Sequence, residues 1–427
     1  MDAFERFILE HSDADIPRLL LSCKEWPDDR DMVASTLEAR SKLRKKVPEW
    51  YAKASLRYPD ALCAEQCSSS VTAAWKAALA ERIIEGGDGR IADLAGGLGV
   101  DSWAFSKVAS EVLYNERSKA LADAAVYNFS ELGAGGIRVS NVELTPATLP
   151  GILLGFNPDL IYLDPARRAC DGRKVFLLED CSPDVLGLLP GLMAACRHLL
   201  LKLSPMADIG MVVDRLDKTY EEYLEKVSGA GWNGRWIREV HVVATGGECK
   251  ELLVWMDREW NGAYSVTCRE DGGTLTFPSV EIAEAKAVLP ESAYADFLFE
   301  PGKSLMKAGL FNAVCSHFGL VKLARFTHLY TFGESLPEGE LRARIEELNR
   351  FGKVFKVKEF LPMDKASMKA VGKRWPHSGV TARNIPLSSD ELRARLGVSA
   401  GDDAHIFGAR VELPFQSGNF LIVCDKV

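Results

Sequence analysis

The spacing of apolar and polar residues changes twice along the chain, near positions 80 and 260. In residues 1–80, apolar side chains recur at three- and four-residue intervals, as in Phe4 and Ile8, which is typical of helices. We expect one helix to start at Ser35–Glu38, where a cap residue comes first, and to end before Pro48. The pattern predicts a helical N-terminal domain.

Residues 81–260 alternate short apolar runs with helical patterns. Five runs have the length and uniform hydrophobicity of buried parallel strands. They are Ile91–Leu94, Val112–Tyr114, Ile137–Val139, Leu160–Leu163 and Leu199–Leu203. Two later runs, Glu239–Ala244 and Glu251–Met256, flank a turn at Thr245–Gly247 and predict a hairpin that closes the sheet. The alternation predicts an α/β domain with a mostly parallel seven-stranded sheet and helices on both faces.

Helices are expected between these strands. Ser102–Ala109 and Ser118–Leu132 have helical spacing. A further helix is expected to open at Ser182-Pro183, where a cap residue precedes a proline at the first helical position.

Beyond residue 260 the pattern loosens into short strands mixed with helices. The expected strands are Tyr264–Cys268, Thr274–Phe277, Lys353–Glu359, Ala404–Leu413 and Asn419–Cys424. The expected helices are Ser279–Val288, Pro337–Phe351 and Leu387–Leu396. This stretch predicts α+β structure in one or two small domains.

Composition excludes several classes of protein. With 427 residues, 47% hydrophobic and 26% charged, the chain has an ordinary globular composition and enough length for about two to four domains. No apolar run approaches the ~20 residues that span a bilayer, and Met1–Arg6 has no basic signal-peptide region. We therefore expect a soluble cytoplasmic protein with no membrane partner.

The ten cysteines do not form a metal or disulfide pattern. Cys63 and Cys67 are the closest two, and they lack further Cys or His at ligand spacing. We expect free thiols in a reducing compartment and no bound metal.

The net charge of −8 hides an uneven distribution. Between Arg350 and Arg383, nine basic residues against two acidic ones give +7, which leaves −15 for the rest of the chain. Phe351, Phe355, Phe360 and Trp375 are interleaved with the basic residues. Such a segment can neutralise nucleic-acid phosphates, and its candidate contacts include Lys369, Lys373 and Arg374. The alternation of Lys353, Lys356 and Lys358 with apolar residues equally fits the solvated face of a strand.

The strongest local motif is the glycine-rich turn at residues 93–101, which follows a buried strand and precedes a helix. Glycine permits positive φ and a close approach of the backbone to a ligand, and a helix start offers free N–H groups. Ser102 stands where a dinucleotide fingerprint has its third glycine, which disfavours an NAD enzyme. The candidate cofactor-binding residues of the turn are Asp93, Ala95, Gly96, Gly97, Gly99 and Asp101.

A second signal comes at the end of the next strand, at Asn115 and Glu116. A carboxylate in this place can accept two hydrogen bonds from a ribose diol. The spacing Asp-x3-Gly-x-Gly from Asp93, followed by such an acid, resembles the pattern of class I S-adenosyl-L-methionine (SAM) methyltransferases. The resemblance implies that Asn115 and Glu116 bind the cofactor; the alternative for Glu116 is an ordinary surface carboxylate.

The fourth strand ends in Asp164-Pro165-Ala166-Arg167-Arg168. Ligands of open α/β sheets bind at the carboxyl ends of the strands, so this loop is expected near the glycine turn. It resembles the Asp/Asn-Pro-Pro-x loop of methyltransferases that act on nucleic-acid bases. That resemblance implies that Asp164 and Pro165 are catalytic and hold the acceptor nitrogen in line with the methyl group.

The loop departs from that pattern at two positions. Ala166 replaces the second proline, and Arg167 stands where amino-methylating enzymes usually place a stacking aromatic residue. Arg167 and Arg168 are candidates for binding phosphate or a base, or they form an exposed basic loop.

Several ordered motifs together resemble an uncharacterised bacterial family of class I SAM-dependent methyltransferases with a C-terminal THUMP-like domain. They are residues 65–69, 93–101, 164–168 and 202–206, continued by 299–301, 307–309, 329–330 and 380–384. The resemblance implies a helical domain at 1–80, a Rossmann-like catalytic domain at 81–260, a small ferredoxin-like domain at 261–325 and a THUMP-like domain at 326–427. Lys202 lies at the end of the fifth strand and is a candidate to line the substrate side of the crevice; the alternative is a plain strand exit.

True THUMP domains accompany tRNA- and rRNA-modifying enzymes, so structured RNA is the implied substrate. The leading hypothesis is a methyltransferase that uses SAM, releases S-adenosyl-L-homocysteine and methylates a nucleobase. The alternatives are an RNA-binding protein with a non-catalytic SAM pocket and a methyltransferase that acts on protein or DNA. Protein partners stay open.

Overall fold

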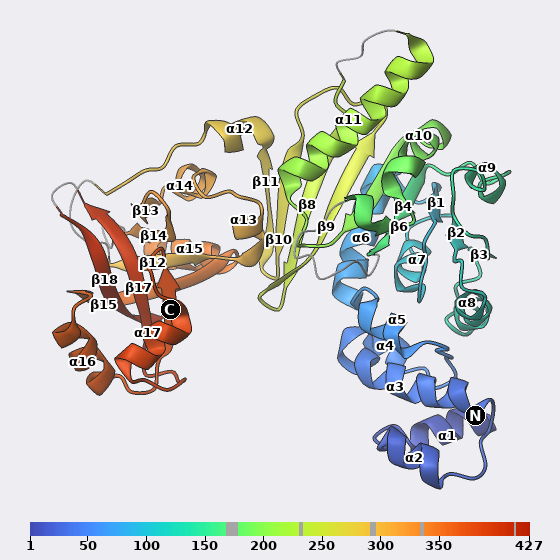
Figure 1. Cartoon of the computed structure of the whole chain (residues 1–427), viewed down its shortest axis with the longest axis horizontal. Helices are drawn as coiled ribbons and strands as arrows, with labels where there is room; N and C mark the ends of the chain where they lie inside the picture. The colour runs from blue at the N-terminus through green and yellow to red at the C-terminus, as the bar shows by residue number, and fades with distance from the viewer. Residues whose placement is uncertain (168–177, 230–233, 291–295, 334–336, 414–415) are drawn as a thin grey trace. The chain divides into compact units, whose positions relative to one another are not determined.

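The computed structural model describes residues 1–167, 178–229, 234–290, 296–333, 337–413 and 416–427. The chain divides into two compact units (Figure 1). The first unit contains Met1–Arg238 and Leu253–Gly262, and the second contains Glu239–Leu252 and Ala263–Val427. The domain boundaries at residues 80, 260 and 325 stay predictions. In the described ranges, no helix is both long and apolar enough to cross a membrane.

The first unit begins with helices, as the spacing of apolar residues predicts. They are α1 (Ala3–Glu10), α2 (Ile16–Ser22), α3 (Arg30–Lys46), α4 (Pro48–Tyr51), α5 (Ala61–Gln66) and α6 (Ser70–Ile83). The prediction that α3 starts at Ser35–Glu38 is wrong. The Asp29 side chain caps the helix earlier by accepting a hydrogen bond from the Met32 backbone, so the first turn is already formed at Arg30.

All five predicted parallel strands of the first unit are confirmed, with ends within one residue of the predictions. They are β1 (Arg90–Asp93), β2 (Glu111–Asn115), β3 (Ile137–Ser140), β4 (Leu160–Leu163) and β7 (His198–Leu203). β1 pairs in parallel with β2 on one side and β4 on the other, while β3 continues beyond β2 and β7 beyond β4. The carboxyl ends of these strands therefore meet at one edge.

Helices follow the parallel strands. They are α7 (Val100–Phe105), α8 (Lys119–Glu131), α9 (Leu149–Ile152), α10 (Val185–Ala195) and α11 (Ile209–Ser228). From β1, the chain moves through β2 to β3 in one direction along the sheet, and later through β4 to β7 in the other direction. Because the crossovers are right-handed, α7 and α8 lie on one face of the sheet, and α10 and α11 lie on the other.

The prediction that Ser182 caps the start of α10 is wrong. Ser182 lies in a short strand, β6 (Cys181–Ser182), which pairs antiparallel with β5 (Ala166–Arg167). The cap is Asp184, whose side chain accepts a hydrogen bond from the Gly187 backbone at 3.1 Å. An aspartate two residues later satisfies the first turn in place of the serine.

The predicted hairpin is formed by β8 (Ile237–Thr245) and β9 (Glu248–Asp257). Its turn has positive φ at Gly246 (61°) and Gly247 (75°), which glycine adopts without steric cost. The full sheet has the order β11-β10-β8-β9-β7-β4-β1-β2-β3, so β10 (Ser265–Glu270) and β11 (Gly273–Pro278) extend the seven predicted strands. Both hairpin strands have residues in each unit.

The second unit contains a seven-stranded sheet in the order β13-β14-β12-β15-β18-β17-β16. Its strands are β12 (Phe297–Pro301), β13 (Val321–Ala324), β14 (Thr327–Phe332), β15 (Gly352–Pro362), β16 (Gly379–Arg383), β17 (His405–Leu413) and β18 (Gln416–Lys426). The helices are α12 (Ser279–Glu284), α13 (Lys303–Lys307), α14 (Ala313–Phe318), α15 (Glu338–Asn349), α16 (Lys365–Arg374) and α17 (Ser389–Leu396). Phe355, Phe407 and Ile422 are buried in one of its core clusters.

One buried side chain joins α8 to the segment between α4 and α5 within the first unit. Asn128 of α8 accepts a hydrogen bond from the Arg57 backbone N–H (2.9 Å) and donates one to the Arg57 carbonyl (2.8 Å). Its residue is 2% exposed, so water does not replace these bonds.

We expect Asn128→Ala to lower the free energy of unfolding by about 1–3 kcal/mol, because two part-buried backbone groups of Arg57 lose their partners. Urea unfolding measures this loss. Ser130→Ala, an exposed change on the same helix, is the control and is expected to have little effect. Equal stability of Asn128→Ala and the control would contradict the role of Asn128.

Candidate cofactor and active site

The glycine turn between β1 and α7 is shaped by close packing and positive φ angles. Gly97 and Gly99 have φ of +53° and +91°. A Cβ atom on Gly96 would lie 2.2 Å from the Tyr114 ring, and one on Gly99 would lie 2.7 Å from Phe129. The Tyr114 hydroxyl also donates to the Gly97 carbonyl at 2.6 Å. The aromatic residues thus hold the turn against β2 and α8, where a side chain on Gly96 or Gly99 would not fit.

Gly97 differs from its neighbours because it faces open space. A Cβ placed on it would have no atom of the described residues within 4 Å. The turn opens onto a cavity of about 590 Å³, within the size range of small-molecule sites. Besides residues 93–101, the cavity is lined by Asp60, Cys63, Gln66, Cys67, Ser68, Asn115, Glu116, Arg117, Ser118, Leu121, Val142, Glu143, Leu144, Tyr162, Asp164, Ala166, Ser182, Pro183 and Lys202.

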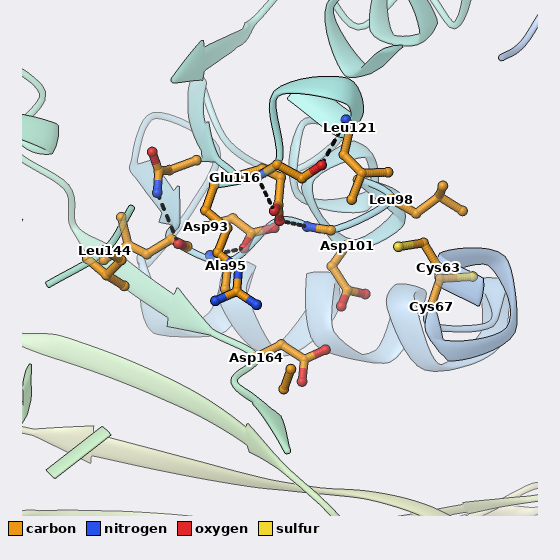
Figure 2. Close-up of a pocket in the computed structure, with 18 of the residues that line it drawn as sticks. Cys63, Cys67, Asp93, Ala95, Leu98, Asp101, Glu116, Leu121, Leu144 and Asp164 are labelled. Carbon is orange, nitrogen blue, oxygen red and sulfur yellow. Dashed lines mark hydrogen bonds between the residues drawn. The ribbon is translucent and has the colours of Figure 1, made fainter. Parts of the chain in front are cut away.

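Glu116 closes one end of the glycine turn. Its Oε2 accepts a hydrogen bond from the Gly97 backbone at 3.0 Å, and its Oε1 accepts one from the Ser118 backbone at 2.8 Å. Figure 2 shows the carboxylate beside the turn, among the residues that line the cavity. Each oxygen keeps a second lone pair, so the carboxylate can still accept hydrogen bonds from a ligand hydroxyl.

Asn115, the other residue predicted at the end of β2, makes structural contacts. Its amide donates to the carbonyls of Leu94 (3.3 Å) and Val142 (3.0 Å), and its Oδ1 accepts from the Val142 backbone. The side chain therefore fastens the glycine turn to the segment that follows β3. It borders the cavity but uses its polar atoms within the protein.

Asp93 is buried at the end of β1 and has an altered titration. Its Oδ2 accepts a hydrogen bond from the Ser102 hydroxyl at 2.5 Å, and its Oδ1 accepts one from the Ala95 backbone at 3.4 Å. Burial raises the pKa of the carboxyl to about 8; the Ser102 hydrogen bond opposes this shift, and the negative charges of Asp101 and Asp164 add to it. Asp93 is therefore largely neutral at pH 7.

Asp101 is equally buried, but it is held as an anion. Lys76 of α6, which is 0% exposed, places its Nζ 3.2 Å from Asp101 Oδ1. The Tyr162 hydroxyl (2.8 Å) and the Ser68 hydroxyl (2.9 Å) both donate to Asp101 Oδ2. Burial by itself raises the pKa of Asp101, but the Lys76 and Lys202 cations and these hydrogen bonds outweigh it and hold the pKa below its usual range.

Asp164 and Lys202 form the pair at the carboxyl ends of β4 and β7. The Lys202 ammonium donates to Asp164 Oδ2 at 2.5 Å. Figure 2 shows Asp164 facing the same space as Asp101. Pro165 is buried between Asp164 and Ala166, which both line the cavity. The sequence-predicted residues Asp93, Gly97, Asp101, Glu116, Asp164 and Lys202 thus surround one cavity.

The cysteines nearest the cavity are protonated thiols. Cys63 and Cys67 lie on the α5 side of the cavity in Figure 2. Burial raises the pKa of Cys63 to about 12 and that of Cys67 to about 11. All cysteines that the structure describes are free, and the same residues contain no group of three or more His, Cys, Asp or Glu that could hold a metal ion.

The remaining predicted residues do not line the cavity or lie outside the residues that the structure describes. Arg167 is in β5, and Arg168 lies outside the described residues. Lys369, Lys373 and Arg374 lie on α16 of the second unit and are exposed; Arg374 also pairs with Glu359 and lies over the Trp375 ring. Among the aromatic residues of that basic segment, Phe351 and Phe355 are buried core residues and do not offer a stacking surface.

Three residues important to the cavity were missed by sequence reasoning. In the sequence, Lys76 is an ordinary lysine within a helix, Tyr114 is an apolar residue of a strand, and Ser102 stands only where a dinucleotide fingerprint has a glycine. One signal for Lys76 is available. This lysine lies on the face of α6 that buries Ala73, Ala77 and Ala80, and a buried ammonium without a charged partner is costly, so its position indicates a buried anion nearby.

Two family models match the C-terminal part of the chain. One is described as a ferredoxin-like domain and matches residues 297–338, and one is described as THUMP domain-like and matches residues 352–426. Both matched regions contribute to one sheet, since β12 pairs antiparallel with β15. A search of curated proteins gives no match.

Solved structures include a similar protein of nearly the same length. It comes from Porphyromonas gingivalis W83, is assigned as a methyltransferase, and is 30% identical with a TM-score of 0.80 over 100% of this chain and 98% of that chain. A protein of Pyrococcus horikoshii assigned as an RNA methyltransferase is 17% identical, with a TM-score of 0.27 over 36% of this chain and 67% of that one. A protein of Streptococcus mutans assigned as a methyltransferase, in complex with SAH, is 11% identical, with a TM-score of 0.28 over 42% of this chain and 96% of that one.

The fold and the position of the cavity define a class I methyltransferase architecture. The seven strands β3-β2-β1-β4-β7-β9-β8 form a mostly parallel sheet closed by a hairpin, and the cavity lies at the carboxyl ends of β1, β2, β4 and β7. The chain belongs to the methyltransferase family that carries a C-terminal THUMP-like domain, to which it is matched over its full length.

We expect Asp93→Asn to stabilise the protein increasingly as the pH rises from about 4 to about 8. The folded-state pKa of Asp93 is raised to about 8 from an ordinary value of 3.8. The stability that the neutral carboxyl permits is therefore fully present below about pH 4 and is lost as the pH rises through about 8. Asparagine does not ionise, so the gain over wild type grows by at most about 1.4 kcal/mol per pH unit.

Urea unfolding of both proteins across this pH range measures the gain. A difference in the free energy of unfolding that does not change with pH would contradict the raised pKa. Asp123→Asn, a change at an exposed carboxyl group of α8, is the matched control.

Proposed function

We propose that the protein is a SAM-dependent methyltransferase that methylates a nucleobase in structured RNA. The single observation that carries this proposal is the shared cavity, in which a glycine turn with open backbone, a strand-end carboxylate and the Asp164 loop converge. Family membership supports the methyltransferase assignment, and the THUMP-like region supports an RNA substrate.

The residues present fit SAM. Gly97 leaves room for a ligand against the backbone, and Glu116 lines the cavity, where its carboxylate oxygens would accept hydrogen bonds from the two hydroxyls of a ribose diol. Asp101 is held as an anion and suits the amino group of the methionine part of SAM. Bound SAM would supply an activated methyl group, and the protein would supply position and orientation.

Asp164 is the proposed group that orients the acceptor. It lies at the carboxyl end of β4 and lines the cavity, with a residue side-chain exposure of 34%, so a ligand can reach it. Methyl transfer is an in-line displacement, which depends on holding the acceptor atom close to the methyl carbon and excluding water. Lys202 is proposed to line the acceptor side of the same space.

The second unit is proposed to bind the RNA. Lys369, Lys373 and Arg374 are exposed along α16, within the region matched by the THUMP-like model. Cations on one helix can neutralise successive phosphates with little dependence on sequence. Their role is docking, and the chemistry belongs to the first unit.

A second candidate function has one observation in its favour. Ala166 and Arg167 depart from the Asp/Asn-Pro-Pro-x pattern of base-methylating enzymes. An RNA-binding protein with a non-catalytic SAM pocket would bind SAM and RNA and form no methylated product.

We expect Asp164→Ala to reduce methyl transfer by more than about 100-fold while the affinity for SAM stays nearly unchanged, because Asp164 positions the acceptor and not the cofactor. Transfer of radiolabelled methyl from SAM to RNA of cells that lack this gene measures activity, and calorimetry measures SAM binding. RNA from wild-type cells, already modified, is the control substrate. Unchanged turnover would remove Asp164 from the mechanism, and SAM binding without product in the wild-type protein would favour the second candidate.

We expect Lys369→Met/Lys373→Met/Arg374→Met to weaken RNA binding and to reduce the slope of log affinity against log salt by about two to three, one for each lost phosphate contact. Filter binding at several salt concentrations measures both. Lys286→Met/Arg342→Met/Lys426→Met makes the same change in net charge at exposed sites of the same unit and is the matched control. Equal loss in both triple variants would contradict a docking role of α16.

A further inference from the structure

The acceptor side of the cavity presents a cation and a carboxylate side by side. Lys202 Nζ lies 2.5 Å from Asp164 Oδ2, and both residues line the cavity. The Lys202 side chain is 15% exposed and comes from β7, while that of Asp164 is 34% exposed and follows β4. A ligand that reaches Asp164 therefore also meets the Lys202 ammonium.

A hydrogen-bond acceptor and a donor at this spacing match a particular kind of base edge. The lactam edge of guanine and of uracil has a ring N–H directly beside a carbonyl oxygen. The N–H can donate to Asp164 while the carbonyl accepts from Lys202, with both groups of the pair satisfied. We propose that Asp164 and Lys202 together select a lactam edge, and that the methyl group is transferred to the ring nitrogen of guanine or uracil. This inference rests on the proposed function and specifies its acceptor.

The same pair can also bind the amino edge of adenine or cytosine. Lactams are therefore selected by their faster reaction and not by binding alone. Adenine and cytosine would donate their amino group to Asp164 and accept from Lys202 at a ring nitrogen. A hydrogen bond from an ammonium to that ring nitrogen withdraws electrons from the amine and makes it a poorer nucleophile. A lactam becomes a better nucleophile instead. Its carbonyl oxygen takes up negative charge as the N–H proton leaves, and the ammonium stabilises that charge.

The proposed reaction balances in protons and electrons. The ring N–H proton moves to Asp164, and the electron pair of the N–H bond forms the new bond from nitrogen to the methyl carbon. The carbon–sulfur bond of SAM breaks, its electron pair stays on sulfur, and S-adenosyl-L-homocysteine leaves. Asp164 then releases its proton to water. Lys202 keeps its protons throughout and acts by charge.

Identification of the methylated nucleoside tests the acceptor. RNA from cells that lack the gene is incubated with the full-length protein and labelled SAM, digested to nucleosides, and separated with mass detection. Label on N1 of guanine or N3 of uracil is the expected result. Label on any other position of a base, including every amino group, overturns the lactam proposal and leaves the nucleobase proposal standing. Label on ribose, on protein or on no product overturns both.

Substitution of Lys202 tests the role of its charge. We expect Lys202→Met to lower the rate of transfer by more than about 100-fold at neutral pH, as loss of an oxyanion-stabilising donor does in other enzymes. We also expect the midpoint of its pH–rate profile to move to higher pH, because the lactam N–H is a weaker acid without the cation beside its carbonyl and loses its proton to Asp164 less readily. An amino acceptor has no proton to lose in that range and would show no such movement.

Two comparisons separate this role from a merely structural one. Lys202→Arg keeps the cation and is expected to retain a midpoint near that of the wild type. Lys218→Met, on the exposed surface of α11, is the matched control and is expected to leave the rate and the profile unchanged. SAM affinity of each variant by calorimetry confirms that the cavity is intact. A Lys202→Met protein that binds SAM and shows the wild-type rate or the wild-type midpoint would overturn the proposal.

Discussion

The buried ion pair between Lys76 and Asp101 is the interaction on which the cavity depends. A fully buried ammonium is stable only with a paired charge and hydrogen bonds, and Lys76 finds both in Asp101 and Ser68. Asp101 in turn binds Tyr162 of β4. The pair therefore ties α6, which precedes β1, to α7, which follows the glycine turn. Loss of one partner of such a pair costs about 3–5 kcal/mol, so the pair strongly stabilises the end of the turn that leads into α7.

Burial has opposite consequences for the two aspartates of the glycine turn. Asp101 lies among the Lys76 and Lys202 cations, and its pKa stays below its usual range. Asp93 receives hydrogen bonds from Ser102 and Ala95, and burial raises its pKa to about 8. One carboxyl is thus an anion and the other is largely neutral at pH 7, within a few residues of sequence. The cavity gains a defined charge pattern without two adjacent buried anions.

Local pattern predicted most elements of the first unit and few of the contacts within it. The parallel strands were found because buried strands are uniformly apolar, and the Asp164 loop because it ends one of them. The start of α3 and the cap of α10 were missed because Asp29 and Asp184 compete with nearby serines for the same role. The strands β12–β14 were not predicted, since short strands without clear alternation resemble other apolar segments.

What the sequence by itself determined is the order of elements, the glycine turn and the identity of the polar residues at strand ends. These depend on periodicity and backbone preference, which act over a few residues. The tertiary structure alone decided that Lys76 reaches Asp101, that Lys202 pairs with Asp164, and that Phe355 belongs to a core. Such pairings join residues distant in the chain, and burial fixes their energy, so no local pattern encodes them.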